Sequence, residues 1–311
     1  MIVIVAAALG LVFTGAFVQL ARRFGWGKAI REAGPQTHLG KAGTPTMGGV
    51  AFLLAAIAAW LLAAEDLTSE LALVLLVVGS AALGLHDDLT SLRRKRRIAN
   101  GADQDGPEAA TGVLARYRLA GQAVLGVAFA WWAVRGGAEA FGIGWLDAAT
   151  FAFVIVGAIN ALNFTDGLDG LAAGIGVIML LFFLGSPFAG ALLGALLGFL
   201  WYNVHPARTF MGGVGAEALG AAVAGLAILQ GTVWYLPLVA LVPVLEVLSV
   251  IVQVIYFRLT NGKRLLRMSP LHHHFELGGW PETRVVQRFY LVTAVCVALA
   301  AALAGRLGTG A

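Results

Sequence analysis

The sequence predicts an all-α membrane protein, folded as a single domain over residues 1–311, with about ten transmembrane helices. Three observations lead to this prediction. The chain is 59% hydrophobic and only 12% charged, whereas a soluble domain is about 25% charged. Apolar runs that could cross a hydrocarbon core of about 30 Å recur along the whole sequence. The basic residues lie almost entirely on alternate loops between these runs, as they do in proteins that thread a membrane many times.

Ten apolar runs are expected to become the helices, because lipid offers backbone N–H and C=O groups no partner outside their own helix. Several are shorter than the roughly 17 residues that a crossing needs, so flanking residues must complete them. In order, the runs cover residues 1–20, 46–64, 71–85, 119–134, 148–162, 171–184, 187–204, 218–230, 236–257 and 289–305.

The charges of the loops orient these helices. Of the 21 Lys and Arg residues, five lie between the first and second runs, seven between the third and fourth, one between the seventh and eighth, and six between the ninth and tenth. Positively charged loops stay in the cytoplasm, so both termini are expected in the periplasm and the active site at the cytoplasmic face. Only Arg135 and Arg306 fall on the other side. The pI near 9.5 therefore reflects anionic membrane lipid or anionic substrates, and no nucleic acid is expected.

Two further observations narrow the class of protein. The single cysteine, Cys296, lies in the last run and excludes an internal disulfide. No internal repeat is visible, which weighs against the inverted-repeat transporters. An ion-coupled transporter that uses its buried acids is kept as a weaker alternative. Four cytoplasmic edges are unusually polar for so apolar a chain, and these are the candidate sites.

The first polar edge is the stretch 41–49, Lys-Ala-Gly-Thr-Pro-Thr-Met-Gly-Gly. Pro45 and the glycines predict a tight turn that leads into a helix. Thr44, Thr46 and free backbone N–H groups at the helix start could hold an anion. An ordinary helix start explains the same residues.

The second edge is His86-Asp87-Asp88, where the third run is expected to meet the cytoplasm. Adjacent residues on a helix point about 100° apart, so the two carboxylates can serve two purposes, one toward a metal and one toward a proton. The alternative is a pair of solvated end charges. An acidic pair is unfavourable at a helix C-terminus, where the dipole is negative, and this favours the functional interpretation.

The third edge carries Asn160, Asn163, Asp166 and Asp169, each three residues from the next. Neighbours at this spacing lie side by side on a helix, and the row winds roughly half a turn along its length, so it should curve around a cavity. Carboxylates and amides at the end of a membrane helix are costly unless they line water or a ligand. Oxygen ligands of this kind suit Mg²⁺ rather than zinc. Helix caps that face solvent are the alternative.

The fourth edge is the stretch 269–282, in which three consecutive histidines follow a basic cluster. Zinc motifs space their ligands, so adjacent histidines rarely converge on one ion. Imidazoles beside basic residues suit phosphate binding better, and a solvated polar loop is the alternative. Glu246, in the ninth run, is a further intramembrane acid. The residues of the edge are His272, His273 and His274, with Lys263, Arg264 and Arg267 before them.

Carboxylates for Mg²⁺, basic and imidazole groups for phosphates, and a site at the membrane fit phosphoryl transfer to or from a lipid. From about residue 37 to 289, the order of motifs resembles the bacterial phospho-N-acetylmuramoyl-pentapeptide transferase family (MraY), of the polyprenyl-phosphate N-acetylhexosamine-1-phosphate transferase superfamily. The histidines and the Gly-Trp-Pro-Glu at 279–282 are the more specific to MraY. The other motifs that carry the resemblance cover residues 43–49, 87–88, 160–172 and 203–212.

The resemblance implies that phospho-MurNAc-pentapeptide moves from its UDP carrier to undecaprenyl phosphate, giving lipid I and UMP in peptidoglycan synthesis. It also implies Mg²⁺, a bacterial inner membrane location and a homodimer. The catalytic residues would be Asp87 (as a base), Asp88, Asp166, His272, His273 and His274. The metal would be held by Asp87, Asp88 and Asp166. The substrate-binding residues would be Lys41, Thr46, Asn163, Asp169, Asn203 and Phe210, the last by stacking on uracil.

Two departures from the family pattern affect this interpretation. Gly213 stands where the family has an Asp that coordinates Mg²⁺, and Glu217 stands where an apolar residue is usual. Ser91 stands where a Lys often follows the acidic pair, and Arg93 or Arg94 could substitute. Glu217 is four residues beyond Gly213, so on a helix it shares that face and could reach the metal.

Several interpretations therefore stay open. The chain is an inactivated variant, a transferase that Glu217 rescues, or a catalytically silent homologue that binds nucleotide or lipid. A transferase for another UDP-N-acetylhexosamine is a further alternative, and the three histidines argue against it.

Overall fold

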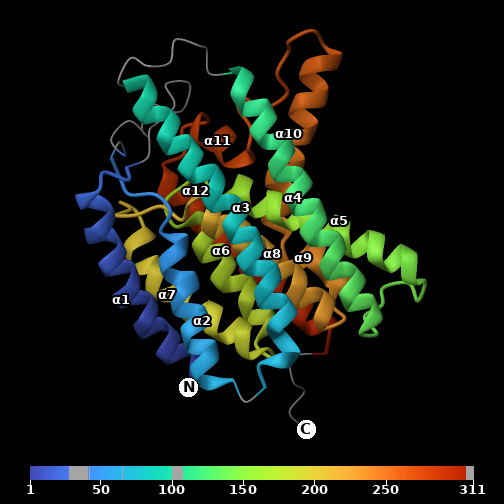
Figure 1. The fold of residues 1–311 in the computed structure, drawn as a ribbon. Coiled ribbons are helices and arrows are strands. Elements are labelled where there is room, and N and C mark those ends of the chain that lie inside the picture. The colour runs from blue at the N-terminus through green and yellow to red at the C-terminus, as the bar shows by residue number, and fades with distance from the viewer. Residues whose placement is uncertain (28–40, 42, 65, 100–107, 306–311) are drawn as a thin grey trace.

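The computed structural model describes residues 1–27, 41, 43–64, 66–99 and 108–305, and the regular elements of this part of the chain are helices joined by turns and loops (Figure 1). A single antiparallel bridge joins Gly27 and Pro45, and no strand forms among the described residues. The helices are α1 (Ile2–Arg23), α2 (Gly49–Ala63), α3 (Thr68–Ala99), α4 (Glu108–Arg135), α5 (Gly144–Thr165), α6 (Leu171–Leu180), η2 (Leu181–Phe183), α7 (Pro187–Asn203), α8 (Gly212–Leu229), η3 (Val233–Tyr235), α9 (Leu236–Val239), α10 (Leu241–Leu259), α11 (Leu271–Glu276) and α12 (Glu282–Leu303).

Every predicted apolar run falls on a helix. Within the described part of the chain, six helices are long and apolar enough to cross a membrane, namely α1, the first 27 residues of α3, α5, α8, α10 and α12. Three shorter apolar helices accompany them, formed by α2, by α6 with η2, and by α7. The helical membrane architecture is thus confirmed. The count of ten crossings and the placement of the termini are taken up under the proposed function.

The ends of several helices differ from the prediction. The third run was expected to end at residue 85, but α3 continues to Ala99, so Asp87 and Asp88 lie within a helix and not at its solvated end. The run 236–257 is divided at Ala240 into α9 and α10. The three histidines lie on the short helix α11. Charged side chains ended the predicted runs, whereas the helical backbone hydrogen bonds continue through them.

The core is organised around α8. Of its residues, 89% are buried, and the helix packs against α2, α3 and α5. Its sequence is mostly Gly, Ala, Leu and Val, and small residues let membrane helices approach closely. A Cβ on Gly84 of α3 would lie 2.3 Å from the Gly213 carbonyl oxygen, and one on Gly220 would lie 2.5 Å from that of Ala158. Glycine is therefore required where these backbones meet.

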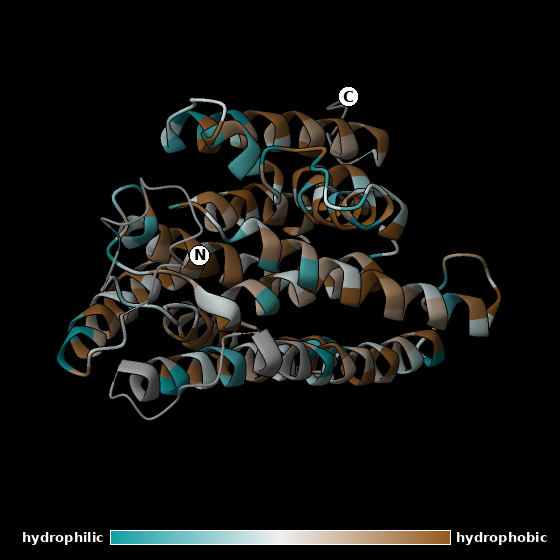
Figure 2. Cartoon of the chain, turned by 90° about the horizontal axis from the view of Figure 1, so that it is seen from above, coloured by the Kyte–Doolittle hydropathy of each residue, from teal (hydrophilic) through white to brown (hydrophobic). Residues whose placement is uncertain are grey.

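The two ends of the bundle have different surfaces. In Figure 1 the chain starts at the lower end, while the carboxyl-terminal ends of α3 and α10 project at the upper end. Trp131, Trp145 and Trp234 are exposed around the α4–α5 connection and η3, as is typical of aromatic residues at a membrane interface. Seen from above, most of the helical ribbon is apolar, with polar residues concentrated in a few segments (Figure 2).

A buried carboxylate also joins helices at the start of α3. Glu70 is 7% exposed. Its Oε2 accepts hydrogen bonds from Trp60 Nε1 at 2.8 Å and from the Phe188 backbone N–H at 2.9 Å, and its Oε1 accepts one from Ser186 Oγ. Three donors from α2 and from the start of α7 satisfy this acid, so its role there is structural.

Candidate active site

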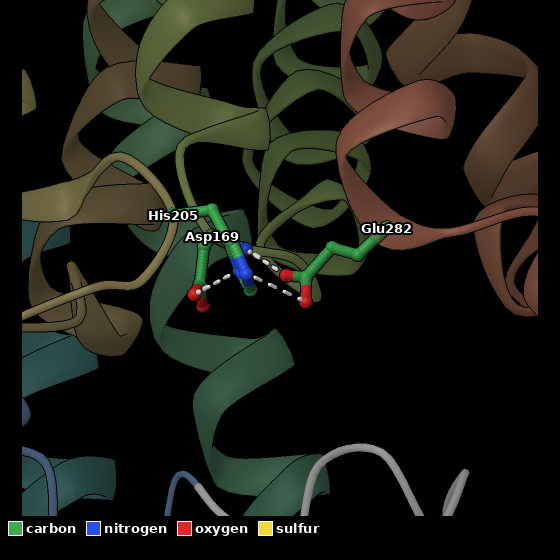
Figure 3. Close-up of side chains that lie close together, drawn as sticks. All are labelled: Asp169, His205 and Glu282. Atoms are coloured by element: carbon green, nitrogen blue, oxygen red, sulfur yellow. Dashed lines mark hydrogen bonds and ion pairs between the residues drawn. The ribbon is translucent and has the colours of Figure 1, made fainter.

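The first group of polar side chains, the Lys41 cluster, consists of Lys41, Asp169, His205 and Glu282. Lys41 Nζ donates to Asp169 Oδ1 at 2.8 Å and to Glu282 Oε1 at 2.6 Å. Asp169 Oδ2 lies 3.1 Å from His205 Nδ1 and accepts from the Ala207 backbone N–H at 3.0 Å. Figure 3 shows the aspartate, histidine and glutamate turned toward one another. Four segments distant in sequence therefore meet at Asp169, which is 3% exposed.

Local structure explains how each side chain reaches this point. Asp169 lies in the turn between α5 and α6, and Gly170, at φ +78°, supplies the left-handed conformation that glycine adopts freely. His205 lies in the turn after α7. Glu282 is the first residue of α12, where the helix dipole favours a negative charge. Its Oε1 also accepts from the Asp169 backbone N–H at 2.6 Å.

Prediction recovered half of the Lys41 cluster. Lys41 and Asp169 were both expected to hold the nucleotide, and the structure brings them together. His205 and Glu282 were not predicted as site residues, although both lie in the motifs that carry the family resemblance. Their places in the motifs at 203–212 and 279–282 could therefore have identified His205 and Glu282 as site residues.

The Lys41 cluster has the ligand atoms for a divalent cation. One atom each from Asp169, His205 and Glu282 lie within 4.8 Å of one another. The Lys41 ammonium, however, already balances both carboxylates. A cation bound at these three residues would have to displace Lys41, so the group fits an internal ion pair better than a resident metal.

The second group, the Arg118 network, consists of Asp87, Arg118, Gln122, Asn160 and Glu217. Arg118 Nη1 donates to Asp87 Oδ2 at 3.2 Å, and Arg118 Nε lies 3.6 Å from Glu217 Oε1. Gln122 Nε2 donates to Glu217 Oε2 at 3.0 Å, and Asn160 Nδ2 donates to Gln122 Oε1 at 2.8 Å. The network joins α3, α4, α5 and α8.

Asp88 adjoins this network and caps a helix. Its Oδ1 accepts from the Gly213 backbone N–H and its Oδ2 from that of Val214, both at 3.2 Å. These N–H groups belong to the first turn of α8, where a helix lacks internal partners and favours an anion. Asp87 and Asp166 lie near enough to Asp88 for their charges to interact with it. Asp87, Asp88 and Asp166 thus lie in one neighbourhood, and their expected role as metal ligands stays a prediction.

Glu217 is oriented away from solvent. It is fully buried, and its two oxygens face Arg118 and Gln122. The prediction that Glu217 reaches a metal stays untested, but the carboxylate already has a basic partner that the sequence pattern did not indicate.

The glycine at position 213 lies directly beside the acidic pair. A Cβ there would lie 3.2 Å from the Gly84 carbonyl oxygen and 3.5 Å from Asp88 Oδ1. A side chain at this position would therefore point at Asp88, with a small local adjustment against Gly84.

The first polar edge pairs with the loop before α8. The Phe210 backbone N–H donates to the Pro45 carbonyl, and the backbone N–H groups of Gly48 and Gly49 donate to the carbonyls of Phe210 and Met211. These two glycine N–H groups, expected to be free for an anion, are thus engaged. Thr46 is 6% exposed.

Asn203 and Asn163 occupy different environments. Asn203 is 3% exposed, and its Nδ2 donates to the Thr209 carbonyl at 2.9 Å. This hydrogen bond therefore stabilises the loop that contains Phe210. Asn163 is half-buried on α5, three residues before Asp166, which ends that helix.

The three histidines point in different directions, as successive residues of a helix must. His272 is 1% exposed, with Nδ1 3.2 Å from Glu246 Oε2 but without hydrogen-bond geometry to it. A Cβ on Gly167 would lie 2.1 Å from His272 Nε2, so this ring lies directly against the Asp166–Asp169 turn. His273 Nδ1 lies 2.7 Å from Glu276 Oε2, and His274 Nδ1 accepts from the Arg267 backbone N–H.

Fold and site together define a helical membrane protein with acids and basic side chains gathered where several helices end, a setting suited to anionic ligands. Residues 70–231 match the model of glycosyl transferase family 4, and residues 41–53 match signature 1 of the phospho-N-acetylmuramoyl-pentapeptide-transferases.

Proteins named phospho-N-acetylmuramoyl-pentapeptide-transferase are similar along nearly their whole length. The one from Deinococcus radiodurans is 42% identical over 95% of this chain and 96% of its own. Those from Moorella thermoacetica and Heliobacterium modesticaldum are 44% and 41% identical, over 96% and 97% of this chain and 95% and 96% of their own. The chain belongs to the phospho-N-acetylmuramoyl-pentapeptide transferase family and is an integral membrane protein.

Proposed function

We propose that this protein transfers phospho-MurNAc-pentapeptide from UDP-MurNAc-pentapeptide to undecaprenyl phosphate, giving lipid I and UMP for peptidoglycan synthesis. The observation that carries the proposal is the identity of 42% and 44% to transferases of that name over almost the entire chain. A phosphate oxygen of the lipid forms a bond to the phosphorus that bears the sugar. The bond from that phosphorus to UMP breaks, and its electron pair leaves with UMP.

The setting of the reaction is part of the proposal. Ten crossings, both termini in the periplasm and a site at the cytoplasmic face of the bacterial inner membrane follow from the charge pattern of the loops. A homodimer is proposed on the family resemblance alone. The meeting of Lys41, which follows α1, and His205, which follows α7, at Asp169 supports a site on one face.

The acidic group is the proposed metal site. Asp87, Asp88 and Asp166 offer the carboxylate oxygens that Mg²⁺ prefers, and each has partners that fix its position. Mg²⁺ bound there would offset the negative charge of the pyrophosphate. Asp87 is proposed to accept the proton of the lipid phosphate, and Arg118 Nη1, which donates to Asp87 Oδ2 at 3.2 Å, orients its carboxylate.

The Lys41 cluster is the proposed nucleotide side of the site. Lys41 would bind phosphate or uracil oxygens, and Asp169 would accept hydrogen bonds from the nucleotide. Phe210, fixed by backbone bonds at both its N–H and its carbonyl, would stack on uracil. His272, against the turn that bears Asp166, would border the phosphates, with His273 and His274 beside it.

The test is transfer from UDP-MurNAc-pentapeptide to undecaprenyl phosphate by the purified protein, with Mg²⁺ and with a chelator. We expect lipid I and UMP in the first case and neither in the second. UDP-N-acetylglucosamine in place of the muramyl substrate is the control. Turnover of that substrate alone would contradict the proposal.

Gly213 motivates a second candidate, a catalytically silent nucleotide or lipid binder. Binding of UDP-MurNAc-pentapeptide without release of UMP, with Mg²⁺ present, would establish this candidate and overturn the transferase proposal.

A further inference from the structure

Glu217 is an acid near the proposed site that no solvent reaches, and its burial demands an explanation. It is fully buried on α8, which is itself 89% buried. A buried carboxylate is costly unless it is paired with an opposite charge and hydrogen-bonded. Here Arg118 supplies the charge at 3.6 Å and Gln122 the hydrogen bond at 3.0 Å.

Arg118 connects this buried acid to the acidic pair. Its Nε faces Glu217 while its Nη1 donates to Asp87. Glu217 Oε1 accepts no hydrogen bond among the described residues, so Glu217 acts on Arg118 through the charge of the 3.6 Å ion pair. Because a guanidinium is planar and rigid, attracting its Nε toward Glu217 also orients its Nη1. The Arg118 side chain is 23% exposed, whereas that of Glu217 is fully covered. The basic group thus borders the site and the acid lies behind it.

The remainder of the network holds Glu217 itself. Gln122 lies one turn beyond Arg118 on α4, so both act from the same face of that helix. Its amide donates to Glu217 and accepts from Asn160 on α5. Glu217 is therefore contacted by two residues of α4, one of which is held in turn by α5, and both of its oxygens face other protein side chains.

We propose that Glu217 is a positioning residue for the transfer reaction, which orients Arg118 against Asp87 and contacts neither substrate nor metal. This rests on the proposed function. Gly213 lacks the negative charge of the Asp that the family has at this position. Glu217 supplies a negative charge one helical turn further along α8 and acts through Arg118. The glycine at position 213 and the glutamate at position 217, both unusual for the family, are then explained together.

The experiment is a double-mutant cycle on steady-state transfer, with Glu217→Gln, Arg118→Gln and both together. Glutamine keeps the shape at 217 and an acceptor for Gln122 but loses the charge. We expect Glu217→Gln to lower kcat about tenfold and to leave both KM values and the half-saturating Mg²⁺ concentration unchanged, because kcat falls alone when only the transition state is affected. The double variant should be no slower than Arg118→Gln.

The control is Glu70→Gln, an equally isosteric change at another buried carboxylate that lies outside the site. It should lower the unfolding temperature in detergent while kcat stays within twofold of the parent. Arg118→Lys provides a second variant that keeps the positive charge. An ammonium is a point charge on a flexible stem and lacks the rigid fork by which Arg118 faces Glu217 with Nε and Asp87 with Nη1. We therefore expect kcat to fall about tenfold and the addition of Glu217→Gln to change it no further.

Other outcomes would contradict the positioning role, the absence of a metal contact or the proposed function. Additive losses in the cycle, or unchanged kcat in Glu217→Gln, would overturn the positioning role. A raised Mg²⁺ requirement in Glu217→Gln would make it a metal ligand. A parent protein that does not transfer at all would overturn the proposed function, whatever the variants do.

Discussion

At the scale of single residues, the acids near the proposed site differ in what holds them. The Asp169 carboxylate is held by Lys41, His205 and the Ala207 backbone N–H. Asp87 is held by Arg118, and Asp88 by the first turn of α8. Equivalent substitutions should therefore have different effects. Sequence spacing identified the acids but not their partners, because the partner of Asp169 at position 282 is 113 residues away.

Asp166 and Asp169 provide the first comparison. Asp166→Asn should leave the protein folded and abolish transfer, because the amide keeps the size and loses the charge. Asp169→Asn should mainly raise KM for the UDP-sugar, because it loosens Lys41 as well. Asp66→Asn is the control, since Asp66 is exposed and its pKa is lowered only by local hydrogen bonds from Thr68 and Ser69. Steady-state kinetics for both substrates would separate the three, and an unaltered rate in Asp166→Asn would remove that residue from the site.

Gly213 carries a second prediction. Gly213→Asp should raise turnover by roughly two orders of magnitude, at the scale of gaining a metal-site contact. The new carboxylate would lie beside Asp88, since a Cβ there is 3.5 Å from Asp88 Oδ1. Gly213→Ala is the matched variant, with the same Cβ and no oxygen, and should gain nothing. Equal rates for the Ala and Asp variants would show that Mg²⁺ does not use this position.

At the scale of helices, the apolar pattern located every long element but not where each one ends. The helix α3 continues past Asp88 through a strongly basic segment to Ala99, because hydrogen bonds within the helix persist where hydropathy falls. The pairing of α3 with α8 was also invisible in the sequence. It depends on glycines on two different helices, and periodicity within one helix does not indicate which neighbour needs the space.

The α3–α8 contact is open to a direct test. Gly84→Ala should destabilise the protein by about 1–3 kcal/mol and reduce transfer, because the new Cβ would lie 2.3 Å from the Gly213 carbonyl oxygen. Gly157→Ala in α5 is the control, because nothing lies within 4 Å of its Cβ position and alanine favours a helix. Thermal unfolding in detergent compares the two. Equal stability would refute this account of the contact.

At the scale of the whole molecule, membrane topology organises the protein. Ten predicted runs and nineteen basic residues on alternate loops predict one arrangement, in which the basic loops share one side of the membrane. Composition predicted this architecture because the bilayer restricts backbone structure so strongly. The contacts that build the site depend on tertiary packing, which composition does not encode.

The topology predicts which positions each side of the membrane can reach. In a background where the buried Cys296 is replaced by Ala, Ser69→Cys should react with an impermeant maleimide on intact cells. Arg96→Cys should react only after permeabilisation. Labelling of both positions from outside would contradict the ten-crossing arrangement.

The bonds made by Lys41 have a consequence for how the protein is made. Lys41 binds one residue 128 positions later and another 241 positions later. Chains are synthesised from the N-terminus, and the earlier segments fold first. Lys41 therefore emerges long before Glu282, the first residue of the last long helix. The Lys41 cluster stays incomplete until that helix is in place, so an unfinished chain, even when inserted in the membrane, lacks this part of the proposed site.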